Sequence, residues 1–80
     1  MKVIAQIPKE DCHVTLFSWN GKYIVKIEQG LLEQTYKINA MDITGESEVY
    51  NLIENEAFMQ SVRTRFEAMN ESLQMAMDIF

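Results

Sequence analysis

The chain has 80 residues, of which 48% are hydrophobic and 24% charged, and its formal net charge is -5 at pH 7. This composition is typical of one folded domain, residues 1–80, and far from that of disordered chains. It excludes a transmembrane helix, because no apolar run approaches the roughly 20 residues that a span needs. A single cysteine cannot form an internal disulfide, and one Cys with one His cannot complete a structural zinc site.

The N-terminal segment 1–8 alternates apolar and polar residues and is too short for the core of a signal peptide. We therefore expect a cytoplasmic protein that folds by packing alone. A domain of this size has a small core, and oligomerisation is one common way to add to it.

Residues 1–40 predict a four-stranded antiparallel β-meander. The segments expected to form strands alternate apolar and polar residues, are rich in β-branched and aromatic side chains, and are separated by turn residues. These strands are expected at 2–8, 12–19, 22–28 and 31–38.

Three turns fix the expected pairing of the strands. Asn20-Gly21 predicts a two-residue type I′ turn, because both residues tolerate positive φ, and places Trp19 opposite Lys22. The same register sets Phe17 opposite Ile24, Leu16 opposite Val25, Val14 opposite Ile27 and His13 opposite Glu28. A turn at Gln29-Gly30 sets Lys26 opposite Glu33 and Ile27 opposite Leu32, and one at Lys9-Glu10 sets Ile7 opposite Cys12, Ala5 opposite Val14 and Val3 opposite Leu16.

Opposed residues share a face of the sheet, so this register separates a core face from an open face. The core face is expected to carry Val3, Ala5, Ile7, Cys12, Val14, Leu16, Tyr23, Val25, Ile27, Leu32, Tyr36 and Ile38, interrupted by Ser18 and Gln34. The open face is mostly polar and charged. It also carries four apolar residues that we expect to cluster at the Asn20-Gly21 end: Ile4, Phe17, Trp19 and Ile24.

Residues 41–80 predict a helical half that packs on one face of the sheet, which makes the fold a two-layer α+β domain. Asp42, Thr44 or Ser47 is a candidate N-cap, followed by acidic residues that suit a helix start. Apolar residues then recur in steps of three and four, the spacing of a helix-packing seam: Met59, Val62, Phe66, Met69, Leu73, Ala76 and Phe80.

Asn55 interrupts the apolar pattern and is itself a candidate N-cap. Residues 47–79 therefore form either one long helix or two helices with a break near Asn55. One rod would be roughly 50 Å long, about twice the length of a strand of seven or eight residues. The helix can break and fold back on the sheet, and the part that overhangs can meet a second subunit; the two outcomes do not exclude each other.

Charge is divided unevenly between the two halves. Residues 1–40 carry five Lys against four acidic residues, whereas residues 41–80 carry two Arg against eight acidic residues. Nucleic acids and anionic membranes bind clustered Lys and Arg, so we expect neither as a partner.

Three polar residues are expected together on the open sheet face: Gln6, His13 and Glu28. An imidazole beside a carboxylate can serve as a base or a pH sensor. Cys12 and His13 do not form a nucleophile–base pair in this register, because adjacent strand residues point to opposite faces. The acidic run after residue 41 matches a Ca²⁺ loop only superficially, and helix-start electrostatics explain it better, so we expect no metal and no cofactor.

The sequence therefore predicts a small protein-interaction or dimerisation module, without catalysis of its own, that forms a homodimer or binds another protein. The expected contact residues lie on the open sheet face and on the helical seam: Ile4, Phe17, Trp19, Ile24, Phe66, Met69, Leu73 and Phe80. The alternative is a small-molecule-binding protein or simple enzyme that uses Gln6, His13 and Glu28. No family resemblance is identified, and neither a partner nor a ligand can be named.

Overall fold

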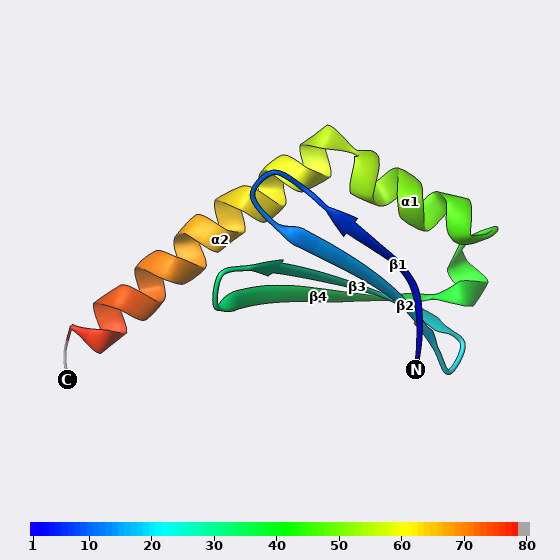
Figure 1. Ribbon diagram of the computed structural model, residues 1–80, viewed down its shortest axis with the longest axis horizontal. Helices are drawn as coiled ribbons and strands as arrows, with labels where there is room; N and C mark the ends of the chain where they lie inside the picture. The colour runs from blue at the N-terminus through cyan, green and yellow to red at the C-terminus, as the bar shows by residue number, and fades with distance from the viewer. Residues whose placement is uncertain (79–80) are drawn as a thin grey trace.

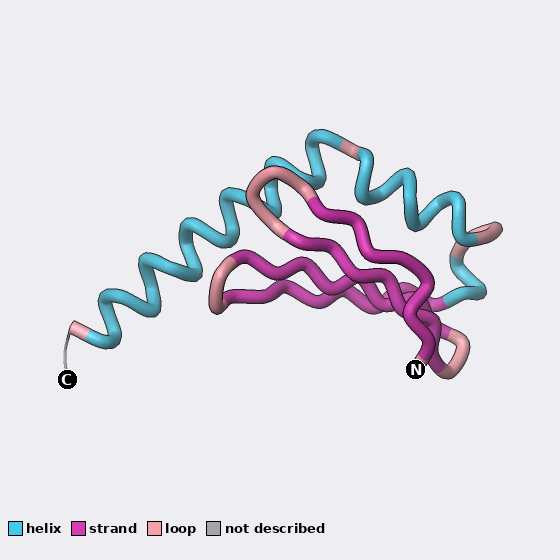
Figure 2. The backbone as a smooth tube through the Cα atoms, viewed as in Figure 1, coloured by secondary structure: helices cyan, strands magenta, loops and turns pink. Residues whose placement is uncertain are grey.

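The computed structural model describes residues 1–78 and confirms the predicted α+β class (Figures 1 and 2). Four strands form an antiparallel sheet in the order β1-β2-β3-β4, and the helices that follow lie on one side of it. The elements are β1 (Lys2–Pro8), β2 (His13–Trp19), β3 (Lys22–Gln29), β4 (Leu32–Asn39), the 3-10 turn η1 (Ala40–Asp42), α1 (Glu46–Glu54) and α2 (Glu56–Met77).

The central hairpin β2–β3 has the predicted register, with Trp19 opposite Lys22 and His13 opposite Glu28. Asn20 and Gly21 both adopt positive φ, 54° and 75°, as a type I′ turn requires. This turn chemistry was specific enough to fix every pair along the two strands.

The predicted pairing of β3 with β4 is wrong by two residues. Lys26 lies opposite Thr35 instead of Glu33, and the turn is formed by Gly30 and Leu31. Gly30 has a φ of 59°, whereas Leu31 is not among the residues with positive φ. A positive φ at the first central residue only, with glycine at that position, is typical of a type II′ turn. The shift is even, so each side chain of β4 keeps its predicted face.

The predicted pairing of β1 with β2 is also wrong. A four-residue loop closes the hairpin, with the amide of Lys9 donating to the carbonyl of Cys12 at 2.8 Å, so that Ile7 lies opposite Val14. The register then shifts at a bulge between Val3 and Ala5. Beyond the bulge Val3 lies opposite Phe17 and not opposite Leu16, so its side chain moves to the open face.

The helical half breaks at Asn55, as one of the two alternatives predicted. The Asn55 side chain accepts a 2.9 Å hydrogen bond from the backbone N–H of Phe58, and the residue is extended at φ -74° and ψ 114°. The N-cap position of α1 is occupied by Gly45, so no side chain there accepts a hydrogen bond from the first turn of the helix. Thr44, one of the predicted caps, instead bonds to the Glu48 carboxylate through its hydroxyl at 3.0 Å and its amide at 3.2 Å.

The core lies between the sheet and the two helices, and its residues on the sheet and on α2 are among those that the alternation and the helical seam predicted. Val14, Leu16, Val25 and Ile27 of the sheet pack with Val49, Ile53, Val62 and Phe66 of the helices, and each of these is at most 2% exposed. Met59 is buried as well. Ile4 packs against this core, whereas Val3 does not, so the bulge exchanges the faces predicted for these two residues.

Helix α2 projects well beyond the sheet. In Figure 1 its C-terminal half runs past the β3–β4 turn with no strand beneath it. The molecule measures 46 × 26 × 20 Å, and its radius of gyration of 14.2 Å exceeds the roughly 12 Å of a compact 80-residue domain. The break at Asn55 therefore folds α1 over the sheet but does not remove the overhang.

Candidate interaction surfaces

The large apolar side chains that remain exposed among the described residues fall into two groups at opposite ends of the molecule. One group lies on the projecting part of α2 and on the β3–β4 turn: Leu31, Leu73, Met75 and Met77. The other belongs to the end of the sheet that carries the β2–β3 turn, together with η1: Met1, Val3, Trp19 and Met41.

The helical members of the first group belong to the α2 overhang, which we define as residues 70–77. Along α2, Met59, Val62 and Phe66 are buried and Met69 is half-buried, whereas every residue of the overhang is exposed. Leu73 continues the same helical seam and is 45% exposed. The seam that packs the first part of α2 on the sheet thus continues into solvent.

Two apolar grooves flank this part of α2. One has a volume of about 600 Å³ and is lined by Leu32, Arg65, Ala68, Met69, Ser72 and Leu73. The second, of about 530 Å³, lies between the β3–β4 turn and the other side of the helix, and its lining includes Leu31, Phe66 and Met77. Leu32 and Leu73 line both grooves, so the two are parts of one apolar surface.

The residues predicted for the helical contact surface differ in how much of each side chain is exposed to solvent. Phe66 is 1% exposed and belongs to the core, so it offers little surface to a partner. Met69 is half-buried at the edge of the core, and Leu73 is exposed. Phe80 lies outside the described residues.

The predicted patch on the open sheet face needs a correction. Ile4 does not lie there, because it is the extra residue of the β1 bulge and packs against the helix-facing core. Ile24 is on the open face opposite Phe17 but is only 5% exposed. Trp19 remains 46% exposed and Phe17 is half-buried. Val3 was predicted on the core face, and the bulge moves it to the open face.

The three residues of the predicted polar cluster, Gln6, His13 and Glu28, all lie in the described part of the chain and are not hydrogen-bonded to one another. Gln6 lies opposite Thr15 and not beside His13, because the β1–β2 register differs from the predicted one. His13 is opposite Glu28, as predicted, but the Glu28 carboxylate lies 3.8 Å from the ammonium of Lys26.

A buried polar network at the helix–sheet interface was missed by sequence reasoning. The Gln34 amide, 8% exposed, donates a 2.9 Å hydrogen bond to the backbone carbonyl of Val62 and accepts from the Tyr36 hydroxyl. Arg65 Nε donates to the Gln34 side-chain oxygen at 3.1 Å and also lies over the Tyr36 ring. The available signal was Gln34 itself, a polar residue on an otherwise apolar face.

A second cluster ties the β1–β2 loop to α2. Arg63 Nε donates to the Asp11 carboxylate at 2.9 Å and a terminal nitrogen of Arg63 donates to Glu56 at 3.2 Å. Both hydrogen bonds raise the pKa of Arg63, and the one to Glu56 has the larger effect. Burial raises the pKa of the neighbouring Cys12 thiol, and the negative charge of Asp11 raises it further.

The two exposed apolar groups differ in the charge that surrounds them. At the Trp19 end, Lys2, Lys22 and Lys37 make no ion pair or hydrogen bond through their ammonium groups among the described residues. On α2 and at its C-cap, Glu67, Glu71 and Asp78 likewise make no ion pair among the described residues. The cations that are paired, Lys9, Lys26 and Arg63, lie elsewhere.

Within residues 1–78, no helix is both long and apolar enough for a membrane span, and no three His, Cys, Asp or Glu side chains are grouped to hold a metal ion. Comparisons of the chain with protein-family models, curated proteins and solved structures find no match.

Proposed function

We propose that this chain is a small protein-interaction module that forms a homodimer through the side of the α2 overhang that carries Leu73. The observation that carries the proposal is the continuation of the α2 seam beyond the sheet, where Leu73 is exposed between two apolar grooves. A helix of an isolated domain usually turns its apolar stripe to its own core, and an exposed apolar stripe is typical of a contact surface.

The surface area supports this proposal. The chain exposes 5595 Å², whereas a compact monomer of its mass exposes about 5,000 Å². The excess of roughly 600 Å² is close to the 800 Å² that each partner buries in an interface of standard size. The radius of gyration of 14.2 Å, larger than that of a compact domain, agrees with a helix that projects beyond the sheet.

A second copy is a suitable partner for the overhang because each chain carries both a ridge and a groove that can receive the ridge of the other chain. Each chain offers a ridge, the projecting seam around Leu73, and an apolar groove beside it that reaches the β3–β4 turn. Two such chains related by a twofold axis can each lay the ridge in the groove of the other, with their α2 helices antiparallel. This arrangement is closed, so it ends at two subunits.

A cytoplasmic location is part of the proposal. With a single cysteine the domain packs without a disulfide, so it does not need an oxidising compartment. The interaction itself requires no catalytic group.

The oligomeric state tests the proposal. Analytical ultracentrifugation of the full chain at about 100 µM should give the mass of a dimer, and Leu73→Glu should return it to a monomer, because the carboxylate would be buried at the interface centre. Met75→Glu is the matched control: residues 73 and 75 lie on different faces of the helix, so it should leave the dimer intact.

A monomer at that concentration would contradict the proposal, as would equal effects of Leu73→Glu and Met75→Glu. Circular dichroism must show that both variants keep their helix. Trp19→Ala should not change the mass, because Trp19 lies at the opposite end of the molecule.

A further inference from the structure

The Trp19 end of the sheet is a second exposed apolar surface, remote from the α2 overhang. Trp19 and Val3 are 46% and 48% exposed, and Val3 lies opposite Phe17 on the same face. The turn η1, which carries the fully exposed Met41, is held to this end by a 3.0 Å hydrogen bond from the amide of Ala40 to the carbonyl of Gly21. We call Trp19, Val3, Phe17 and Met1, without Met41, the Trp19 surface.

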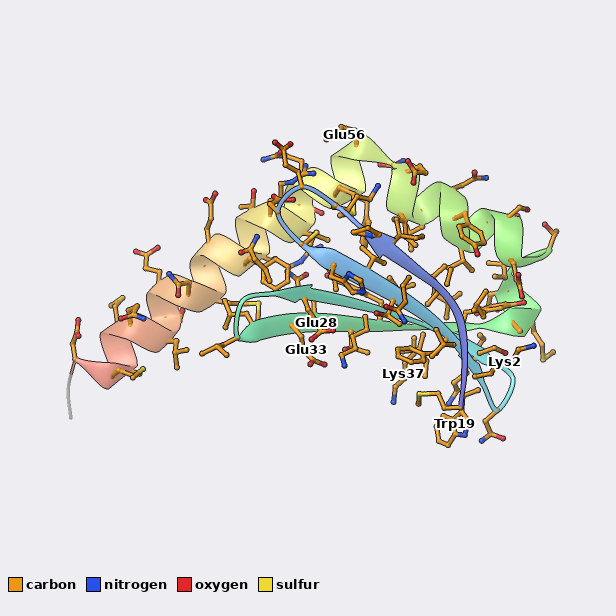
Figure 3. All side chains as sticks on the ribbon, in the orientation of Figure 1. Lys2, Trp19, Glu28, Glu33, Lys37 and Glu56 are labelled. Atoms are coloured by element: carbon orange, nitrogen blue, oxygen red, sulfur yellow. The ribbon has the colours of Figure 1, made fainter. Side chains whose placement is uncertain are left out.

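Lysines border the Trp19 surface. Lys22 is paired directly with Trp19, and Lys37 is paired with Ile24, the residue opposite Phe17. Lys2 lies opposite Ser18, at the same end of the sheet but on the other face. Figure 3 shows Lys2, Trp19 and Lys37 together at this end of the molecule.

The charge on the open face around Trp19 is positive although the whole chain carries -5. Lys22 and Lys37 lie on this face, whereas the acidic residues at the same end, Asp42, Glu46 and Glu48, belong to η1 and to the start of α1 on the helix side. Neither lysine is neutralised by an ion pair with another described residue. Since the molecule is 46 Å long, the acidic residues Glu67, Glu71 and Asp78 on and next to α2 lie several Debye lengths, of about 8 Å each, from this end at physiological salt.

We propose that the Trp19 surface binds an acidic peptide segment of a partner protein, in which carboxylates alternate with apolar side chains. Trp19 and Val3 supply the apolar contact at the centre, and the ammonium groups of Lys22 and Lys37 pair with carboxylates at the rim. Aromatic anchors surrounded by complementary charge are the usual arrangement of such contacts.

Two other anionic partners fit the surface less well. Lysine clusters that hold a protein on an anionic membrane contain four to eight cations, and this end of the molecule has three, one of them on the other face. Nucleic acid binding on a sheet combines stacked aromatic side chains with a groove of basic residues along the backbone, whereas this surface has one exposed aromatic ring. A peptide needs only apolar and charged groups close together on the protein. Trp19 and Val3 provide the apolar groups here, and Lys22 and Lys37 provide the charged ones.

Intrinsic fluorescence gives a direct test, because Trp19 is the only tryptophan of the chain. The probe is a 12-residue peptide of alternating Glu and Leu or Phe, titrated into the full-length protein. We expect a blue shift of the Trp19 emission with a dissociation constant below about 1 mM, and binding several-fold weaker when NaCl rises from about 50 to 500 mM.

Matched lysine variants locate the site. Lys37→Gln should weaken binding about fivefold or more, whereas Lys26→Gln should change it less than about twofold. Lys26 is on the same sheet face but is paired with Glu28 and lies away from Trp19. Both lysines are on the surface, so neither change removes a core contact, and thermal melts of the variants should match that of the parent chain.

Three results would overturn the proposal: no shift of Trp19 emission up to about 1 mM peptide, equal binding of the same peptide with every Glu replaced by Lys, or equal effects of Lys37→Gln and Lys26→Gln. Tighter binding of phosphatidylserine vesicles or of an oligothymidine strand than of the peptide would also overturn it. The proposal is independent of dimerisation, and the titration is expected to be the same in the Leu73→Glu variant.

Discussion

The side-chain amide of Gln34, in the middle of β4, donates a 2.9 Å hydrogen bond to the backbone carbonyl of Val62 in α2. The same side chain accepts hydrogen bonds from Arg65 and Tyr36, so its amide oxygen and nitrogen are both satisfied although the residue is buried. This contact joins the sheet to the helix just before the helix leaves the sheet.

Replacing Gln34 with leucine should therefore destabilise the protein in spite of the gain in apolar surface. The Val62 carbonyl and the Tyr36 hydroxyl would lose buried partners, at a cost of about 1–3 kcal/mol. Urea denaturation followed by circular dichroism measures the loss. Gln60→Leu, at an exposed position of α2, is the control and should change stability by no more than about 0.5 kcal/mol. Equal stability of the two variants would show that the network contributes nothing.

Asn55 should contribute to stability as the N-cap of α2. In Asn55→Ala the backbone N–H of Phe58 loses its 2.9 Å acceptor, and we expect a loss of about 1 kcal/mol. Asn51→Ala is the matched control, because Asn51 is exposed within α1 and the change favours helix. The prediction is wrong if Asn51→Ala destabilises as much as Asn55→Ala in the same thermal and urea melts.

Cys12 should react slowly with iodoacetamide near neutral pH. Burial raises the pKa of its thiol and Asp11 raises it further, so less of the reactive thiolate is present than in an unperturbed cysteine. Asp11→Asn removes the negative charge, and we expect a lower thiol pKa and a several-fold higher alkylation rate at pH 8.

The pH profile of the alkylation rate separates this effect from a loss of structure. In Asp11→Asn the midpoint should move to lower pH, while Asp42→Asn, far from the thiol in sequence, should leave it in place. Because a raised thiol pKa means that the folded state binds the proton more tightly, the contribution of Cys12 to stability is present below the ordinary thiol pKa and is lost as the pH rises through the raised one.

Strand order and most of the core could be predicted from the sequence, because alternation and the Asn20-Gly21 turn are local signals. The errors came from turns with weaker signals. Gly30 can occupy either central position of a two-residue turn, and its position decides between the two registers of β3 and β4. The bulge at Ile4 has no signature, since Val3, Ile4 and Ala5 are all apolar and either parity fits the pattern.

The candidate surfaces could be predicted only in part, because the exposure of a residue depends on its neighbours in space. Leu73 and Trp19 were identified as contact residues and are exposed. Phe66 continues the same seam but is buried, because the sheet extends far enough to cover it and not Leu73. The exposed Leu31 was overlooked, because the β3–β4 turn was placed one residue too early in the chain.

The last two turns of α2 have a consequence for folding as well as for contact. Residues 70–77 are all exposed and have little tertiary packing beyond the grooves that Leu73 lines with Leu32, so their helix depends mainly on local propensity and should fray, with amide hydrogens that exchange much faster than those of Met59 to Phe66. Any chain that docks on them must also order them, and part of the association free energy is spent on this helix–coil transition. Slow amide exchange at these positions would therefore report assembly directly.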